Sequence, residues 1–432
     1  MKPIQEALQK DFLFFDGAMG TQLQAAGLPA AQHPESYNLT HPEAIIDIHR
    51  RYLDAGANVI SACTFGAYSH KMGNTEEIIS AAMANARAAI NGRANCFVAL
   101  DMGPTGRMLV PVGDTPFDTA YDIFKETAML GARHGADCVI IETMMDLYEM
   151  KAAVLAVKEN TDLPVFCSFA YEKNGRTLTG GTPLSASVIL EGLNVDAIGV
   201  NCGAGPDFAA AIAEATLTAA SVPVMVQPNA GLPKLDANGG SYFDLTASDF
   251  AQGMARIAQG GARVLGGCCG TTPAHIAAMV QACKDITPVP LAPKTAAYIA
   301  TNGKVFCLDG ATPAYGIITA ADEAVITALQ DGDMYDIADM AIEHKDNEAD
   351  ILVLRIGAAG VDEAGIMPDV INAIQQVAAM PMQIETANPA ALEAALRTLS
   401  GKAAVCLLSD DALLAETARA LVAQYGGVFV KA

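Results

Sequence analysis

Two adjacent cysteines between glycines, in Gly266-Gly267-Cys268-Cys269-Gly270, are the residues of this chain with the clearest capacity for chemistry. Successive side chains on a strand point to opposite faces, so neighbouring thiols can face one point only where the backbone leaves strand geometry. Glycine permits such a turn, and the mostly apolar run at 262–265 just before it predicts a strand. Two thiols at the C-terminal end of a strand could hold a soft metal ion such as zinc.

Cys202 is a third candidate ligand, because it follows another short apolar run, at 197–200. Three sulfurs would leave one position of a tetrahedral zinc ion open for a substrate. The alternative is that Cys268 and Cys269 are small core residues, as most buried cysteines are. The C-x-x-C spacing of a common zinc site is absent, so the residue pattern alone leaves both interpretations open.

The remaining cysteines are predicted to be small core residues: Cys63, Cys96, Cys138, Cys167, Cys283, Cys307 and Cys406. A disulfide framework is not expected in a chain of 432 residues that is 52% hydrophobic. Many unpaired thiols favour a cytoplasmic location.

Composition also excludes two classes of partner. A net charge of −22 argues against nucleic acid, because binding phosphates requires clustered Lys and Arg. The first ten residues lack an apolar signal segment, and no run of about 20 apolar residues predicts a membrane span. The length of 432 residues suggests more than one domain, one of which could be a large α/β barrel.

Short apolar runs alternate regularly with alanine-rich segments of helical period over residues 1–286. Strands are predicted at 12–15, 59–62, 96–100, 138–141, 165–169, 197–200, 224–227 and 262–265. Helices are predicted at 42–55, 78–91, 117–134, 147–159, 185–193, 207–219, 247–259 and 273–283. This alternation predicts a (β/α)8 TIM barrel, in which catalytic groups occupy the C-terminal strand ends.

Polar residues fall at those predicted strand ends. They are Asp16, Cys63 with Thr64, Asp101, Glu142, Ser168, Asn201 with Cys202, Asn229, and Cys268 with Cys269. Asp101 and Asn201 also fit helix caps or turns, which Asp and Asn commonly make. Glu142 follows three apolar residues directly, and a carboxylate inside a barrel mouth is costly unless it meets a cation or hydrogen-bond donors.

Several short segments together resemble the homocysteine S-methyltransferase family. They are Phe15-Asp16-Gly17-Ala18-Met19-Gly20-Thr21, Gly103-Pro104-Thr105, Ile141-Glu142-Thr143, Asn201-Cys202-Gly203, Pro228-Asn229-Ala230-Gly231 and Gly266-Gly267-Cys268-Cys269-Gly270. Their order and spacing are similar, more narrowly, to the homocysteine-binding module of cobalamin-dependent methionine synthase.

The resemblance implies a zinc site formed by Cys202, Cys268 and Cys269, with the homocysteine sulfur at the fourth position. It also implies a substrate pocket: Asp16 and Glu142 for the ammonium group, backbone amides near Gly17 and Ala18 for the carboxylate, and Asn201 as a further contact. Asn229 is a candidate exchangeable zinc ligand. The chain departs from the family at Ala62-Cys63-Thr64-Phe65, where Thr-Asn-Thr-Phe is common, so Cys63 is expected near the site but outside the ligand set.

The expected function is therefore zinc-dependent methyl transfer to homocysteine, giving methionine. No D-x-H-x-x-G segment of a cobalamin-binding module occurs, so methylcobalamin is expected on a separate corrinoid protein. The alternatives are a small donor such as S-methylmethionine or another onium compound, and a corrinoid-linked methyl transfer to a different thiol. A non-enzymatic zinc scaffold is disfavoured, because structural zinc sites are closed by four protein ligands.

A proline-rich linker is predicted at 287–299, followed by a smaller open α/β domain at 300–432. Helices are predicted at 333–345, 362–377, 389–399 and 411–425, and strands at 351–356, 382–385, 403–408 and 428–430. The order of its motifs resembles part of a pterin-binding barrel. Three pterin-contacting motifs have changed, to Val353-Leu354-Arg355, Glu385-Thr386-Ala387 and Ala403-Ala404-Val405-Cys406, so this domain is expected to dock a partner and not to bind folate.

Overall fold

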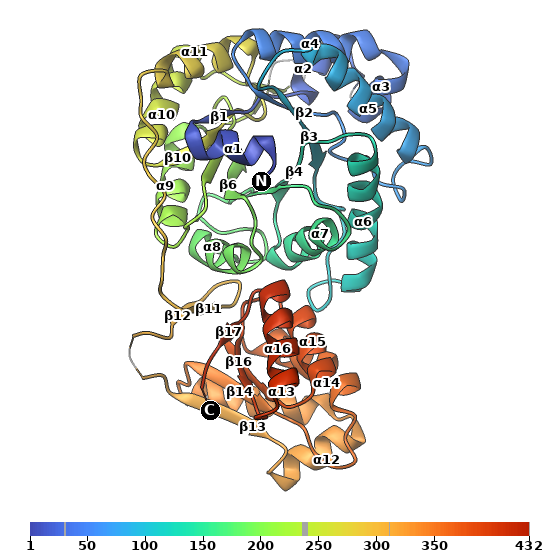
Figure 1. Cartoon of the computed structure of the whole chain (residues 1–432), viewed down its shortest axis with the longest axis vertical. Coiled ribbons are helices and arrows are strands. Elements are labelled where there is room, and N and C mark those ends of the chain that lie inside the picture. The colour runs from blue at the N-terminus through green and yellow to red at the C-terminus, as the bar shows by residue number, and fades with distance from the viewer. Residues whose placement is uncertain (30–31, 236–240, 311, 432) are drawn as a thin grey trace. The chain divides into compact units, whose positions relative to one another are not determined.

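The computed structural model describes residues 1–29, 32–235, 241–310 and 312–431 (Figure 1). These residues form two compact units: Met1–Arg107, Asp118–Leu178 and Val195–Pro293 in the first, and Met108–Phe117, Thr179–Asn194 and Lys294–Ala432 in the second. Two segments of the second unit, 108–117 and 179–194, thus lie within the sequence predicted as one barrel domain, 1–286. Among the described helices, none combines the length and apolar character that a membrane span requires.

Eight parallel strands form the sheet of the first unit, in the order β1-β10-β7-β6-β5-β4-β3-β2. They are β1 Leu13–Phe14, β2 Val59–Ser61, β3 Phe97–Met102, β4 Cys138–Met144, β5 Val165–Phe169, β6 Ala197–Cys202, β7 Val224–Pro228 and β10 Ala262–Leu265. A bridge between Phe15 and Val59 brings the two edges together. The predicted TIM barrel is confirmed, and β3, β4 and β6 run further toward their C-terminal ends than predicted.

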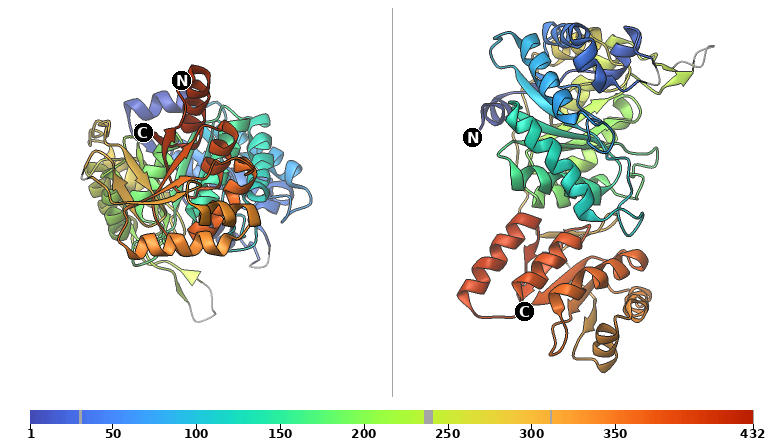
Figure 2. Two further views of the ribbon diagram at one scale, coloured as in Figure 1. Left: turned by 90° about the horizontal axis from the view of Figure 1, so that it is seen from below. Right: turned by 90° about the vertical axis from the view of Figure 1, so that its right-hand side faces the viewer.

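Helices precede, separate and follow these strands in the chain, and those of the first unit lie mostly outside the ring of strands (Figure 1). They are α1 Pro3–Lys10, α2 Gly20–Ala25, α3 Tyr37–Thr40, α4 Pro42–Asp54, α5 Thr75–Ile90, α6 Phe117–Arg133, α7 Leu147–Asn160, α8 Pro183–Gly192, α9 Pro206–Leu217, α10 Ala247–Gln259 and α11 Pro273–Cys283, with a 3₁₀ turn at Pro34–Ser36. A small hairpin, β8 Lys234–Leu235 with β9 Ser241–Tyr242, projects from the barrel (Figure 2).

The barrel interior is filled by alternate residues of the strands. The buried interior cluster includes Ala99 of β3, Ile140 of β4 and Met225 of β7. The intervening residues face the helices: a Cβ at Gly131 of α6 would lie 2.5 Å from Leu100 Cδ2. Because strand side chains alternate, the next inward positions after this cluster open into the C-terminal mouth of the barrel.

The second unit contains a five-stranded parallel sheet whose strands are neighbours in chain order, so the predicted smaller open α/β domain is confirmed. Its strands are β13 Tyr315–Thr319, β14 Ile351–Arg355, β15 Met382–Thr386, β16 Ala404–Leu407 and β17 Val428–Phe429. Its helices are α12 Glu323–Asp331, α13 Met334–Asp346, α14 Glu363–Val377, α15 Pro389–Thr398 and α16 Ala412–Tyr425.

Four elements of the second unit were not predicted: β13, α12, and the strands β11 Tyr298–Ala300 and β12 Val305–Cys307, which form a hairpin. The hairpin begins within the segment predicted as linker, 287–299. It packs against the sheet through a small core formed by Ile299, Ile351 and Ala404. A three-residue strand is too short for its periodicity to be read from sequence.

Candidate metal centre

The sulfur atoms of Cys202, Cys268 and Cys269 all lie within 4.8 Å of one another. Cys202 ends β6, and the other two occupy the loop between β10 and α11. Two backbone hydrogen bonds fix this loop to the end of β7: Cys268 N donates to Pro228 O (2.9 Å) and Ala230 N donates to Cys269 O (3.0 Å). Thiols 66 residues apart in the sequence therefore converge at the C-terminal mouth of the barrel.

The backbone of Cys202 adopts a left-handed conformation, with φ +57°. Strand alternation turns Asn201 inward and would turn Cys202 toward the helices. The left-handed residue ends this alternation, and the Sγ of Cys202 lies 2.8 Å from that of Cys268. Such a backbone is uncommon outside glycine and is often found at functional sites.

Glycines 266, 267 and 270 are required by close packing around the cysteines. A Cβ at Gly266 would lie 2.9 Å from Phe15 Cβ, and one at Gly267 would lie 2.5 Å from Thr271 Oγ1. Gly270 has φ +78°, and a Cβ there would lie 2.1 Å from Phe243 Cγ. The motif therefore shapes the loop through residues that have no side chain, while the cysteines supply its chemistry.

Asn201 connects three strands to the sulfur cluster. Its Oδ1 accepts hydrogen bonds from Thr143 N (2.8 Å) and Ser168 Oγ (2.8 Å). Its Nδ2 donates to Thr143 Oγ1 (2.7 Å) and to Cys268 Sγ (3.8 Å). The structure thus directs this amide at a sulfur, and a direct contact of Asn201 with substrate stays a prediction.

Ionisation of the three thiols is unequal. Hydrogen bonds from Cys202 and Cys268 lower the pKa of Cys269 to about 3. Hydrogen bonds with Cys202 and then with Cys269 raise the pKa of Cys268, because they favour its protonated form. The cluster by itself therefore stabilises one negative charge, and all three sulfurs could ionise together only around a cation. Three soft sulfur ligands fit zinc.

Asn229 also has an unused ligand atom. Its Nδ2 donates to Gly203 O (2.7 Å), whereas its Oδ1 is buried and has no hydrogen-bond partner among the described residues. An amide oxygen with a free lone pair beside the cysteine loop suits the exchangeable ligand predicted at this position.

Asp16 and Glu142 are both desolvated. Burial raises the pKa of Asp16 to about 8, with a contribution from the charge of Glu142. Burial and the charge of Cys269 raise the pKa of Glu142 to about 7. Asp16 Oδ2 accepts a hydrogen bond from Ser61 N (3.0 Å) and lies 3.9 Å from Nδ1 of the buried His49. A cation entering between these carboxylates would favour their ionised forms.

The predicted amides for a substrate carboxylate lie beside the same loop. A Cβ at Gly17 would lie 2.6 Å from Thr271 Oγ1, so only glycine fits there. Ala18 N already donates to Thr271 Oγ1 (3.2 Å), and it would have to exchange this partner to bind a carboxylate. Cys63 is buried, and the charges of Glu35 and Asp101 help to raise its pKa, so it lies near the acidic part of the mouth.

Sequence reasoning missed the roles of Thr143 and Thr271 at this mouth and left that of Asp101 undecided. Asp101 lies within β3 and caps no helix, contrary to the turn or cap interpretation. Thr143 has φ +59° and bonds Asn201, and Thr271 accepts from Ala18 and donates to Cys268 O (2.7 Å). Asp101 could have been found by counting alternate residues along its strand, whereas the other two carry no local signal.

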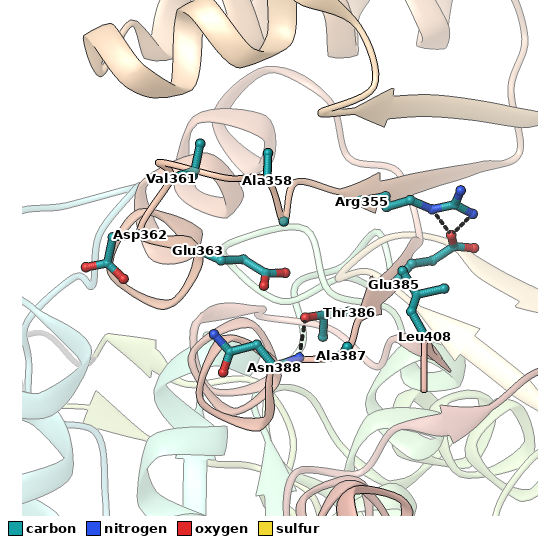
Figure 3. A pocket seen from close by; sticks show the side chains of 11 residues that line it. Arg355, Ala358, Val361, Asp362, Glu363, Glu385, Thr386, Ala387, Asn388 and Leu408 are labelled. Carbon is teal, nitrogen blue, oxygen red and sulfur yellow. Dashed lines mark hydrogen bonds and ion pairs between the residues drawn. The ribbon is translucent and has the colours of Figure 1, made fainter. Parts of the chain in front are cut away.

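The second unit has a cavity of about 600 Å³ at the C-terminal ends of β14, β15 and β16 (Figure 3). Two of the residues that depart from the pterin-binding pattern, Arg355 and Glu385, form an ion pair in its wall. Gln383 Nε2 donates to the other oxygen of Glu385 (2.6 Å), so both oxygens of this carboxylate are engaged within the chain.

Comparisons with known proteins cover both units. The chain is 30% identical to the methionine synthase of Mycobacterium tuberculosis over 98% of its own length and 31% identical to that of Mycobacterium leprae over 93%. It spans only 38% and 36% of those relatives. The metallated homocysteine methyltransferase MmuM of Escherichia coli shares the fold, with a TM-score of 0.55 at 23% identity over 64% of this chain and 98% of that one. A family model described as homocysteine S-methyltransferase matches residues 13–283, and the chain belongs to this family.

Proposed function

We propose that this chain transfers a methyl group to the thiolate of homocysteine, giving methionine, with zinc held by Cys202, Cys268 and Cys269. One observation carries the proposal: in a chain of this family, three sulfurs from two strand ends lie within 4.8 Å of one another. When bound there, zinc would supply the positive charge that lets a thiol ionise at neutral pH.

The rest of the mouth would bind the amino-acid part of the substrate. Asp16 and Glu142 would accept hydrogen bonds from the ammonium group, and this would relieve the desolvation that raises the pKa of both. The amides near Gly17 and Ala18 would bind the carboxylate. Asn201 would hold Cys268 in place, and Asn229 would be the exchangeable ligand.

The reaction is a nucleophilic displacement. The ionised homocysteine sulfur attacks the methyl carbon, the S–C bond forms, and the bond between methyl and donor breaks with its electron pair left on the donor. The carboxylates position the nucleophile by binding its ammonium group, which lies away from the reacting atoms.

The proposed donor is methylcobalamin on a separate corrinoid protein; residues 1–432 themselves contain no D-x-H-x-x-G segment. The alternatives are S-methylmethionine or another onium donor, and a corrinoid-linked transfer to another thiol.

Two measurements test this function. Anaerobic metal analysis should give stoichiometric zinc in the wild type and in Cys96→Ala, a cysteine outside the cluster, and much less in Cys268→Ala. Wild-type protein without zinc would contradict the proposal. Methionine formation from homocysteine is then compared with free methylcobalamin and with S-methylmethionine as donor, and methylation of another thiol alone would reassign the substrate.

For the second unit we propose partner docking without folate binding. The support is the ion pair between Arg355 and Glu385 in the cavity wall. The polar groups of these two side chains bind each other, so they are not available to a pterin. Titration calorimetry with methyltetrahydrofolate should detect no binding, and saturable heat would contradict this assignment.

A further inference from the structure

Asp101 carries a buried carboxylate, and no structural role in the fold explains its side chain. The residue is 8% exposed, and its Oδ1 is buried without a hydrogen-bond partner in the described part of the chain. The backbone is fixed independently, because Asp101 N donates to Thr64 Oγ1 (3.0 Å) and Thr64 Oγ1 donates to Asp101 O (2.8 Å). An unpaired buried carboxylate oxygen is costly, so a compensating ligand is the physical expectation.

The strand register directs this carboxylate into the mouth. Ala99, two residues earlier on β3, belongs to the interior cluster, so Asp101 also faces inward. Asp101 pairs with Ile140 of β4, another interior residue, and Glu142 lies two residues further along the same face. Asp101 and Glu142 therefore project from adjacent strands into one space.

Electrostatics bring a third carboxylate into this set. Burial, then the charges of Glu142, Asp16 and Glu35 raise the pKa of Asp101. Glu35 lies outside this set of three, and its Oε1 accepts a hydrogen bond from Gly66 N (2.6 Å). No Lys or Arg of the described residues forms an ion pair with any of the three. The imidazole of His49 lies 3.9 Å from Asp16 and is kept neutral by burial, which lowers its pKa to about 4. The three carboxyl groups thus form an acidic pocket with which no Lys or Arg of the described residues pairs, and a bound cation would favour their ionised forms.

A primary ammonium group matches this pocket, because it carries one positive charge and three N–H donors. We propose that Asp101 is a specificity-determining residue that accepts one N–H of the substrate ammonium, beside Asp16 and Glu142. This inference rests on the proposed function, in which homocysteine is the ligand.

The test compares homocysteine with 4-mercaptobutyrate, the same thiol acid without its amino group. Binding of both to the zinc-loaded protein is measured by anaerobic calorimetry, for the wild type and Asp101→Asn. Asp101→Ser is a second variant in case the first folds poorly, and Asp137→Asn is the control. Asp137 precedes β4 at the opposite end of the barrel, where it accepts from Val98 N (2.7 Å).

The wild type should bind homocysteine at least about tenfold more tightly than 4-mercaptobutyrate. Asp101→Asn should weaken the binding of homocysteine about tenfold and change the binding of 4-mercaptobutyrate by less than about twofold, at unchanged zinc content. If Asp101→Asn weakens the binding of both thiols equally, or does not weaken the binding of homocysteine, the inference is overturned and the proposed function stays intact. If neither thiol binds the wild type, the proposed function itself is wrong, and the inference falls with it.

Discussion

The side-chain amide of Asn201 donates a hydrogen bond to Sγ of Cys268 over 3.8 Å, and its other polar contacts tie it to Thr143 and Ser168. Asn201 is fully buried, so this amide cannot turn toward water without breaking the network. An N–H donor aimed at a sulfur favours the thiolate and fixes its direction. The proposed metal site is therefore supported from β4, β5 and β6 together.

Asn201→Ala should lower zinc affinity by about 10–100-fold, which is the usual effect of losing a residue that orients a metal ligand. Competition with a chromophoric chelator measures this affinity. Ser168→Ala is the matched variant, because it removes a bond to Asn201 Oδ1 and leaves the N–H···S contact in place. If both variants lower the zinc affinity equally, the hydrogen bond from Asn201 to Cys268 is not the cause of the loss.

Gly270→Ala should destabilise the protein by about 1–3 kcal/mol and reduce its zinc content, because the new Cβ meets Phe243 at a left-handed position. Gly20→Ala is the control, since a Cβ there meets nothing within 4 Å and Gly20 begins helix α2. Its effect should be neutral or slightly stabilising. Urea denaturation measures the stability of both variants. A Gly270→Ala variant as stable as the wild type would contradict the packing argument.

Titration of Asp16 and Glu142 should make the metal-free protein less stable as the pH rises toward their folded pKa values. Asp16 and Glu142 have pKa values raised to about 8 and about 7, so below these values the folded chain binds protons that the unfolded chain has released. The contribution of these two carboxylates then falls by about 1–2 kcal/mol between pH 6.5 and 7.5. Asp101, whose pKa burial also raises, acts in the same direction, whereas Cys269, whose pKa is lowered to about 3, acts in the opposite one. His49, whose pKa burial lowers to about 4, acts in the same direction as Cys269, but mainly below about pH 6.5, where an unfolded histidine titrates.

Denaturation curves at pH 6.5 and 7.5, with a chelator present, measure this slope. The double variant Asp16→Asn with Glu142→Gln should flatten it. If the double variant shows the same pH dependence of stability as the wild type, other groups cause that dependence.

Arg355→Ala should destabilise the second unit by about 1–3 kcal/mol, because it leaves the buried Glu385 without its cation. Adding Glu385→Gln should recover part of the loss. Arg133→Ala, which breaks an exposed pair with Glu76, should cost at most about 1 kcal/mol and serves as the surface control. Thermal unfolding of the three variants gives the comparison, and equal losses from the two arginine variants would contradict the burial argument.

Local pattern was sufficient for the barrel and for its cysteines. Eight apolar runs separated by segments of helical period specify parallel strands, because strand and helix periodicities are properties of neighbouring residues. The glycines around Cys268 and Cys269 carried the same kind of local signal, since each marks a position without room for a Cβ. The three-residue strands β11 and β12 were missed because so few residues contain too little periodicity.

Contacts between distant segments were decided only by the tertiary structure. Closure of the ring, with Phe15 beside Val59, sets which strand ends share the mouth. The left-handed turn at Cys202, the donation of Asn201 to Cys268, the engaged amide of Ala18 and the inward carboxylate of Asp101 all depend on it. The sequence by itself predicted which residues could bind a metal and an amino acid. Their directions depend on packing between segments far apart in the chain, which no local pattern encodes.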